Sequence, residues 1–331
     1  MLDLNLLTLL ILINIIFFIF FNKLNKLINL YDLPNKRKIH TNPTPCNGGV
    51  YLVITLSVFL LFYKSEFFDS QNLLLNLRHF YSFYITVLLV FFVGYIDDLV
   101  DLSALKKTVF LSIIIYAAIS IDPELIISNL HFSFVEKIFY LQNMSNFFTL
   151  LCIFIFISAF NMFDGTNLQS GLYTLSIIII FILYSGYINL FLPILSFLVF
   201  FIFYNSRGKI FLGNSGSHVM GFVCSWFFIK LYNKTLIPNA DEIILIMLIP
   251  GLDLVRLFIS RILSKTSFFS ADRNHIHHIL MKKFSGFRLQ LLILFVVLFP
   301  ISIFYFTKIF LLSFILGIIN YSILIYTFKK S

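Results

Sequence analysis

Long apolar segments recur along the whole chain, and they limit its possible folds more than any other feature. A helix needs about 20 apolar residues to cross a lipid bilayer, and shorter segments are tolerated within a packed bundle. Only 12% of the residues are charged, against about 25% in an ordinary soluble domain. We therefore predict an all-α integral membrane protein, a polytopic bundle of about 10–11 transmembrane helices. The predicted spans are 4–21, 49–63, 81–96, 108–121, 144–160, 169–185, 187–204, 215–231, 243–260, 289–305 and 309–327.

Lysine and arginine are divided unequally between the two sides of these spans. The first span has no basic residue before it and no small-residue cleavage site after it, so we interpret it as a retained helix whose N-terminus lies outside. Of the 24 basic residues, 18 then lie inside, as the positive-inside rule expects. We predict a cytoplasmic C-terminus and one transmembrane domain over residues 1–331. The six basic residues predicted outside are Lys64, Arg78, Lys137, Lys230, Lys234 and Lys308.

The net charge of +9 could suggest a nucleic acid partner. The basic residues, however, lie in short loops between spans, with no soluble domain to read a groove. Membrane topology and anionic substrates explain the charge, so we predict no nucleic acid binding.

The first two inner loops carry charged clusters. Basic residues, Lys38 and His40 among them, precede the pair Gly48-Gly49, which suggests an ordered turn where backbone segments approach closely. The alternative is an ordinary positive-inside loop. The second loop holds Asp97, Asp98 and Asp101, followed by Lys106 and Lys107. If the helix continues, Asp97 and Asp101 share one face. Such carboxylates repel one another unless a divalent cation, bound through diphosphate oxygens, makes the cluster useful. The alternative is a solvated helix end.

The third and fourth inner loops combine polar side chains with glycine. Asn161 and Asp164 are three residues apart and can converge. Gly165 and Gly171 permit a broken or re-entrant backbone beside a cavity, although a plain loop is the alternative. Residues 207–218 place glycines and hydroxyls before a predicted helix, where free N–H groups suit phosphate. Glycine and serine are also ordinary turn and cap formers.

The fifth inner loop contains Arg273, His275, His277 and His278. A zinc site would need a fixed fourth ligand, and the loop has neither a cysteine pair nor a His-Glu-x-x-His motif. Imidazole and guanidinium groups are better suited to hold a diphosphate or a sugar by charge-assisted hydrogen bonds.

Taken in order, these five segments resemble the polyprenyl-phosphate N-acetylhexosamine-1-phosphate transferases, the family that includes the MraY and WecA types. The resemblance covers residues of about 30–280, and the His-Ile-His-His ending is similar to the WecA branch. The matching residues are the loop Pro34–Gly49, Asp97-Asp98-x-x-Asp101 with Lys106-Lys107, Asn161-x-x-Asp164-Gly165, Phe211-Leu212-Gly213-x-Ser215-Gly216-Ser217 and Arg273-x-His275-Ile276-His277-His278.

The resemblance implies an activity and its partners. A sugar 1-phosphate of the N-acetylhexosamine type, such as N-acetylglucosamine 1-phosphate, would pass from a UDP-sugar to polyprenyl (undecaprenyl) phosphate. UMP would be released, and Mg²⁺ or Mn²⁺ would be the cofactor. The resemblance further implies a bacterial plasma membrane, a cytoplasmic site and the first step of a lipid-linked glycopolymer pathway, and it leaves a homodimer open.

The resemblance also implies roles for individual residues. Asp97 or Asp98 would receive the lipid phosphate's proton or position the phosphate for attack, and Asp164 would serve catalysis and the metal. Asn161 would lie on the nucleotide side of the site and Asn167 near the uridine. The remaining expected substrate-binding residues are Lys38, His40, Asp101, Lys106, Ser215, Ser217, Arg273, His275, His277 and His278.

Two departures from the family pattern bear on this expectation. Asn214 stands where the family usually has the aspartate expected to be the principal metal ligand, and a neutral amide oxygen should bind a divalent ion less tightly. The stretch Asn167-Leu168-Gln169-Ser170 also differs from many relatives, so nucleotide or sugar preference can differ. Two alternatives stay open: a transporter or flippase for a lipid-linked or nucleotide sugar, which should have polar residues at mid-membrane, and a family member inactivated by Asn214.

Overall fold

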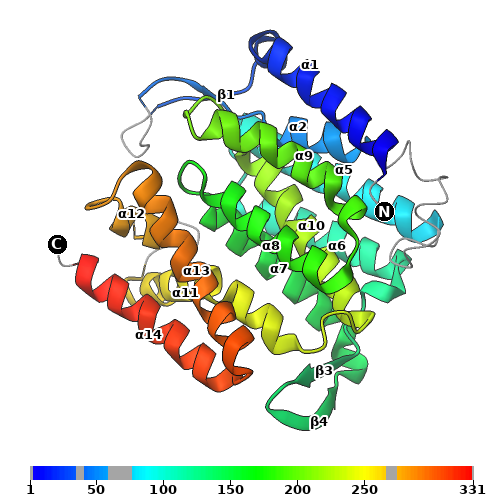
Figure 1. Cartoon of the computed structure of the whole chain (residues 1–331), viewed down its shortest axis with the longest axis vertical. Helices are drawn as coiled ribbons and strands as arrows, with labels where there is room; N and C mark the ends of the chain where they lie inside the picture. Colours follow the sequence, from blue (N-terminus) through cyan, green and yellow to red (C-terminus); the bar gives the residue numbers. More distant parts are fainter. Residues whose placement is uncertain (1–2, 35–40, 59–76, 266–273, 330–331) are drawn as a thin grey trace.

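The computed structural model describes residues 3–34, 41–58, 77–265 and 274–329. Each predicted span has a helical counterpart, and eight helices in the described ranges are long and apolar enough to cross a membrane. This confirms the prediction of an all-α polytopic membrane protein (Figure 1). The helices are α1 (Leu4–Ile28), α2 (Gly48–Leu56), α5 (Leu77–Val100), α6 (Ala104–Ile121), α7 (Ser145–Phe163), α8 (Gln169–Ser185), α9 (Ile188–Asn205), α10 (Gly213–Asn233), α11 (Ala240–Leu263), α12 (Ile276–Leu280), α13 (Gly286–Thr307) and α14 (Phe310–Lys329).

Two short antiparallel hairpins and two 3₁₀ turns connect these helices. Strand β1 (Tyr31–Asp32) pairs with β2 (Thr44–Pro45) in the first inner loop. Strand β3 (Asn129–Phe132) pairs with β4 (Val135–Tyr140) between α6 and α7. The turns η1 (Pro123–Leu125) and η2 (Gln142–Met144) flank that second hairpin.

Helix α10 forms the centre of the bundle. It contacts α5, α7, α2 and α8, and all its residues from Ser215 to Tyr232 are buried. It is not among the eight strongly apolar helices, because a helix surrounded by protein needs no lipid-compatible surface and can carry Gly, Ser, His and Lys. Gly221 permits close packing, since a Cβ there would lie 2.8 Å from the Cα of Ile157.

The peripheral helices expose their apolar side chains outward. Helices α1, α6 and α14 bury the smallest share of their residues, and α1 and α14 lie at opposite margins of the bundle in Figure 1. Ile11, Ile19 and Phe306 are among the exposed large side chains. Such surfaces suit lipid, which satisfies no backbone polar groups and therefore requires helices to bond internally.

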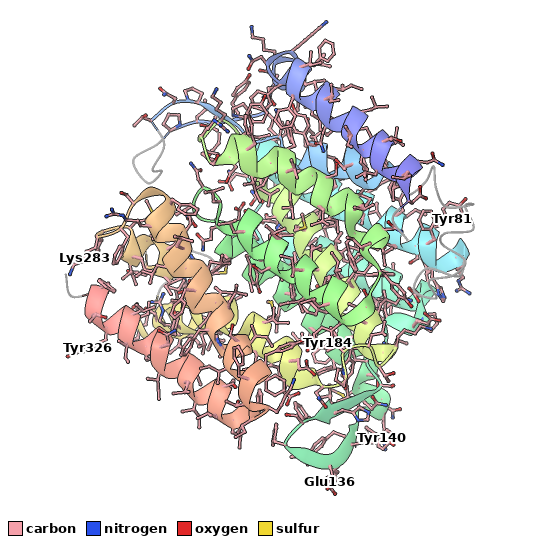
Figure 2. The ribbon with its side chains drawn as sticks, viewed as in Figure 1. Tyr81, Glu136, Tyr140, Tyr184, Lys283 and Tyr326 are labelled. Carbon is pink, nitrogen blue, oxygen red and sulfur yellow. The ribbon has the colours of Figure 1, made fainter. Side chains whose placement is uncertain are left out.

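The two ends of the bundle differ in what they carry. β1, α12 and the C-terminus lie at one end, while the N-terminus and the β3–β4 hairpin lie at the other (Figure 1). Figure 2 places Tyr81, Tyr140 and Tyr184 toward the hairpin end and Tyr326 at the opposite end. Tyrosines at both ends match the aromatic belts of membrane proteins. The outside location of the N-terminus stays a prediction.

A buried charge network joins α5, α10 and η1 at the hairpin end. The ammonium of Lys230 is fully buried, with Nζ 2.9 Å from Oδ1 of Asp122 and 3.0 Å from Oε2 of Glu124. His79 Nδ1 lies 3.5 Å from the same Asp122 oxygen. His79, Asp122 and Glu124 form the one His, Asp and Glu group of the described chain that could converge on a metal ion. Lys230 already supplies the positive charge there, so we interpret the network as structural.

Candidate active site

Asp98 connects the end of α5 to the start of α10. Its Oδ1 accepts the N–H of Asn214 at 2.8 Å and its Oδ2 accepts the N–H of Ser215 at 3.0 Å. The first N–H groups of a helix have no partner within the helix, and the helix dipole favours a negative charge there. Asp98 therefore caps α10 from a different helix and brings the second and fourth motifs together.

Asp97 is bound by the segment that follows it. It is buried, its Oδ2 lies 3.0 Å from Lys107 Nζ, and its Oδ1 accepts the N–H of Leu102 at 2.8 Å. Lys106, expected at the site, is exposed, and its neighbour Lys107 makes the contact instead. The shared helical face of Asp97 and Asp101 is wrong, because α5 ends at Val100. Asp101 is exposed at φ 52° and donates its N–H to the Asp97 carbonyl, which closes the helix.

Two glycines allow the motifs to meet at backbone distance. A Cβ on Gly94 of α5 would lie 2.5 Å from the Cα of Ser215, and one on Gly49 would lie 2.5 Å from the N of Gly216. The N–H groups of Gly48 and Gly49 donate to the carbonyls of Phe211 and Leu212, each at 3.0 Å. This confirms the predicted close approach of the first inner loop, and its contact is the segment that precedes α10.

Substituting Gly94→Ala should therefore destabilise the protein. The added methyl would press on α10 backbone and not on a flexible side chain, and forcing extra volume into a packed site costs about 1–3 kcal/mol. Gly251→Ala is the matched control, because a Cβ at that helical glycine meets nothing within 4 Å. Thermal unfolding in detergent should show a lower midpoint for Gly94→Ala only. Equal midpoints for the two variants would contradict this packing.

Asn161, near the end of α7, joins the third motif to α10. Its Nδ2 donates to Asn214 Oδ1 at 2.9 Å and to Ser217 Oγ at 2.7 Å. Ser215 and Ser217 are both fully buried. Packing against the neighbouring helices encloses both residues, and the expectation that their hydroxyls bind substrate stays a prediction.

Asp164 follows the last residue of α7 and shares its surroundings with Asp98. Asp164 is half-buried. Burial raises the pKa of Asp164 to about 6. A hydrogen bond with Ser170 lowers this pKa, and the nearby charge of Asp98 raises it. The two carboxylates thus lie close enough to influence each other, as a site for a positively charged ligand requires.

The turn from α7 to α8 is short and is attached to two other helices. The helical backbone breaks at residues 164–168, which include Gly165, whereas Gly171 lies within α8. The left-handed residue of the turn is Leu168 at φ 70°. The Thr166 hydroxyl donates to Gln169 Oε1 at 2.8 Å and accepts from Gln290 Nε2 of α13 at 2.9 Å. Asn167 lies beside Gly208 of the fourth loop, its Nδ2 3.4 Å from where a Gly208 Cβ would be.

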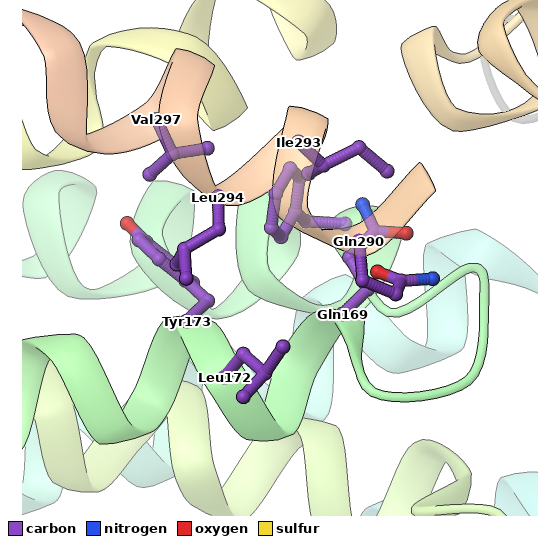
Figure 3. A pocket seen from close by; sticks show the side chains of 8 residues that line it. Gln169, Leu172, Tyr173, Gln290, Ile293, Leu294 and Val297 are labelled. Atoms are coloured by element: carbon purple, nitrogen blue, oxygen red, sulfur yellow. The ribbon is translucent and has the colours of Figure 1, made fainter. Parts of the chain in front are cut away.

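A crevice between α8 and α13 lies directly beneath this turn. In Figure 3, Gln169 and Gln290 lie side by side at one end of the crevice, and Tyr173 and Val297 lie toward the other. The cavity volume is about 10 Å³, close to what one water molecule needs. The crevice is therefore too small to hold a sugar or a lipid chain in this conformation.

The histidine segment meets the Asp164 turn through His277. A Cβ on Gly165 would lie 2.0 Å from His277 Nε2, so only glycine lets the ring approach this closely. Burial holds the pKa of His277 well below its usual range, with contributions from His278 and His275. His277 is buried, and the expectation that it binds a diphosphate or a sugar stays a prediction. His275 and His278 are half-buried, and Lys38, His40 and Arg273 lie outside the described residues.

The donor atoms fit a hard divalent cation that is bound mainly through its substrate. Mg²⁺ is commonly held by one or two carboxylates together with substrate phosphates. Asp164 offers a carboxylate with the charge of Asp98 nearby. Asn214 offers an amide oxygen that already accepts from Asn161. Asp164 is thus the stronger candidate ligand.

Residues 80–232 match the model of glycosyl transferase family 4. The chain is 29% identical over 267 residues to the undecaprenyl-phosphate alpha-N-acetylglucosaminyl 1-phosphate transferase of Yersinia pestis, covering 77% of this chain and 70% of that protein. The family model and this relative both point to the family that the five motifs resemble. A probable undecaprenyl-phosphate N-acetylglucosaminyl 1-phosphate transferase of Bacillus subtilis is 28% identical over 284 residues, which cover 83% of this chain and 76% of that protein.

The match to glycosyl transferase family 4 and the named relatives support the resemblance inferred from the motifs. The matched segment runs from within α5 to within α10, and so contains Asp97, Asp98, Asn161, Asp164 and Asn214. The first inner loop and the histidine segment lie outside that match, yet the structure brings both against it. The described parts of the five motifs are thus gathered at one end of the bundle, and the matches support a membrane-bound sugar-phosphate transferase.

Proposed function

We propose that the protein transfers an N-acetylhexosamine 1-phosphate from a UDP-sugar to a polyprenyl phosphate and releases UMP. The observation that carries the proposal is the meeting of five separate polar segments at one end of an apolar bundle. The names of the relatives support undecaprenyl phosphate and an N-acetylglucosamine-type donor as the substrates. We assign this end to the cytoplasmic face of a bacterial inner membrane, where UDP-sugars dissolve.

The position of the site suits one lipid and one water-soluble substrate. A polyprenyl chain can stay in the membrane beside the helices while its phosphate reaches the bundle end. The charged and polar motif residues gather at that end, which favours catalysis at the interface over a mid-membrane transport path.

The reaction requires one oxygen of the lipid phosphate to attack the phosphorus that bears the sugar. The bond from that phosphorus to the bridging oxygen breaks, and UMP leaves with the bonding electrons. Asp98 is less buried than Asp97 and its charge acts on Asp164. We therefore assign receipt or positioning of the lipid phosphate's proton to Asp98. Asp97, bound to Lys107, fixes the end of α5.

Asp164, supplemented by Asn214, would hold Mg²⁺ or Mn²⁺ through oxygen atoms. The metal would neutralise charge on the diphosphate. Asn161 would keep Asn214 oriented, since its amide donates to the Asn214 oxygen. The half-buried rings of His275 and His278 would contact the diphosphate or the sugar at the edge of the site.

Asn214→Asp should strengthen metal binding if this assignment is right. A carboxylate replaces a neutral oxygen, so the Mg²⁺ concentration for half-maximal activity should fall about tenfold. Asn239→Asp adds the same charge before α11, in the connection that follows α10 at the other end, and should leave the Mg²⁺ dependence unchanged. An unchanged requirement in Asn214→Asp would contradict the assignment. Activity in this variant alone would show that the natural chain is inactive because of Asn214.

Formation of a lipid-extractable labelled sugar tests the proposed function against transport. Purified protein in detergent would receive undecaprenyl phosphate and UDP-N-acetylglucosamine labelled in the sugar, with and without Mg²⁺. Lipid-dependent and metal-dependent label in the organic phase is the expected result. No labelled lipid with any UDP-amino sugar, together with label crossing sealed vesicles unaltered, would overturn the transferase in favour of a transporter.

A further inference from the structure

Asp253 on α11 is buried and lies at the centre of a hydrogen-bond network that reaches His275. The residue is 4% exposed. Oδ1 accepts from Arg256 at 2.7 Å, from the Tyr321 hydroxyl at 2.8 Å and from the N–H of Ile276 at 3.1 Å. Oδ2 lies 3.0 Å from Nδ1 of His275. One carboxylate thus joins α11 and α14 to the start of α12.

Arg256, one of the partners of Asp253, makes two further hydrogen bonds. Arg256 Nε donates to the Tyr321 hydroxyl at 2.7 Å, and its Nη2 also donates to the Asn274 carbonyl at 2.5 Å. Tyr321 comes from the last helix of the chain. Helix α14 therefore helps to set the position of a carboxylate that contacts the histidine segment.

The contact with Asp253 determines which nitrogen of His275 carries hydrogen. An ionised carboxylate can only accept, so Nδ1 of His275 must be the donor. A carboxylate in this position fixes both the tautomer and the ring orientation of its histidine. Nε2 is then the one ring nitrogen that remains for a ligand.

The His275 ring is connected to the candidate active site through His277. His275 and His277 stack with centroids 5.3 Å apart and planes within 6° of parallel. His277 in turn covers Gly165, the residue after Asp164. Asp253, His275, His277 and Gly165 thus form a continuous line of contacts from α11 to the Asp164 turn.

We propose that Asp253 is a positioning residue that fixes His275 in its Nδ1–H form and so places the histidine segment on the Asp164 turn. It acts through His275 and does not itself touch the substrate. The consequence for catalysis rests on the proposed transferase function, whereas the state of the His275 ring does not.

Asp253→Asn tests the ring state directly. The amide keeps the size of the carboxylate but has one oxygen, which should turn to the three donors that now share Oδ1. Its NH₂ would then face His275 Nδ1 and oblige that nitrogen to become the acceptor. In ¹⁵N-histidine-labelled protein, with His275 assigned by loss of its signals in His275→Gln, Nδ1 should be protonated in the natural chain and unprotonated in Asp253→Asn. The same protonation of Nδ1 in both proteins would overturn the proposal.

A double-mutant cycle tests the consequence for turnover. Asp253→Asn should lower kcat/KM about 10- to 100-fold, the usual effect of losing a partner that orients a ligand-binding histidine. In a His275→Gln background the same change should cost less than about threefold, since coupled residues are non-additive. An equal loss in both backgrounds would indicate a purely structural residue and overturn the proposal. If the natural chain forms no product, the proposed function fails, and the ¹⁵N result still decides the role of Asp253.

Two tyrosines of α14 provide a matched test of the hydrogen bond between Tyr321 and Asp253. Tyr321→Phe removes the hydroxyl that donates to Asp253, and kcat/KM should fall about fivefold, consistent with the loss of roughly 1 kcal/mol. Tyr326→Phe makes the same change at a side chain that is 67% exposed at the end of the helix. It should leave kcat/KM unchanged. Equal effects of the two substitutions would show that the hydrogen bond from Tyr321 does not support the position of Asp253.

Discussion

Asp164→Asn is expected to abolish activity and at the same time to stabilise the metal-free protein at pH 8. Turnover should fall at least about 10³-fold, because the substitution removes the proposed charged metal ligand where transition-state charge develops. Stability should rise because burial and Asp98 make the ionised Asp164 carboxylate unfavourable in the folded state. Gain of stability with loss of function is the usual behaviour of a residue kept for chemistry.

The pH dependence of this stability follows from the direction of the pKa shift. The Asp164 pKa is about 6 in the folded protein, against an ordinary value of 3.8. Below the ordinary value the carboxyl is protonated in both states and costs nothing. As the pH rises through 6 the folded state must hold the charge, and the natural chain loses up to roughly 3 kcal/mol at 1.36 kcal/mol per pKa unit. The Asn side chain never ionises, so the variant should not show this loss.

Thermal unfolding in detergent and EDTA at pH 4 and pH 8 checks this expectation. Asp164→Asn should unfold at a higher temperature than the natural chain at pH 8 and at nearly the same temperature at pH 4. Glu136→Gln, an exposed carboxylate on the hairpin at the far end, controls for simple loss of charge. An unchanged or lowered midpoint for Asp164→Asn at pH 8 would show that Asp164 is not an uncompensated buried charge.

Lys230→Met is expected to be the most destabilising substitution at the opposite end of the bundle. The ammonium and the Asp122 carboxylate are both fully buried. Removing one partner of a buried ion pair costs about 3–5 kcal/mol, because the other charge stays buried without compensation. The unfolding midpoint in detergent should fall accordingly, and Asp122→Asn in the same chain should restore part of the loss.

Lys234→Met provides the matched comparison for this network. Lys234 contacts the same Glu124 at 3.4 Å, but its side chain is 37% exposed. Exposed pairs contribute about 0–1 kcal/mol, so its substitution should change the midpoint little. If the two lysine variants lowered the unfolding midpoint equally, burial would not determine how much each ion pair contributes to stability, and the interpretation would be contradicted.

Hydrophobic patterning predicted the helices well because each span must satisfy its own backbone bonds in lipid. It could not predict that α10 would be central, although its glycines and serines are typical of a helix packed on all sides. Among the site residues, Asn161 and Asp164 were predicted from local spacing. Asp101 was not predicted correctly, since one left-handed residue ended the helix earlier than the charge pattern suggested.

The remaining differences come from tertiary contacts that local sequence does not encode. Nothing in the local sequence indicates that Gly165 makes room for His277, or that burial lowers the pKa of this histidine. Asp253 and Arg256 stand three residues apart, which indicates an ion pair on one helix face. Their partners His275 and Tyr321 come from other segments, so the role of Asp253 becomes visible only in the fold.

Following the β-phosphorus of the donor tests the central claim most directly. Purified protein would be given undecaprenyl phosphate, Mg²⁺ and UDP-N-acetylglucosamine labelled with ³²P only at the phosphorus attached to the sugar. We predict that the ³²P appears in the lipid product and that unlabelled UMP is released in equal amount, with neither product formed by Asp164→Asn. Release of labelled UDP, or of labelled sugar phosphate into water without lipid product, would contradict transfer of the sugar phosphate to the lipid.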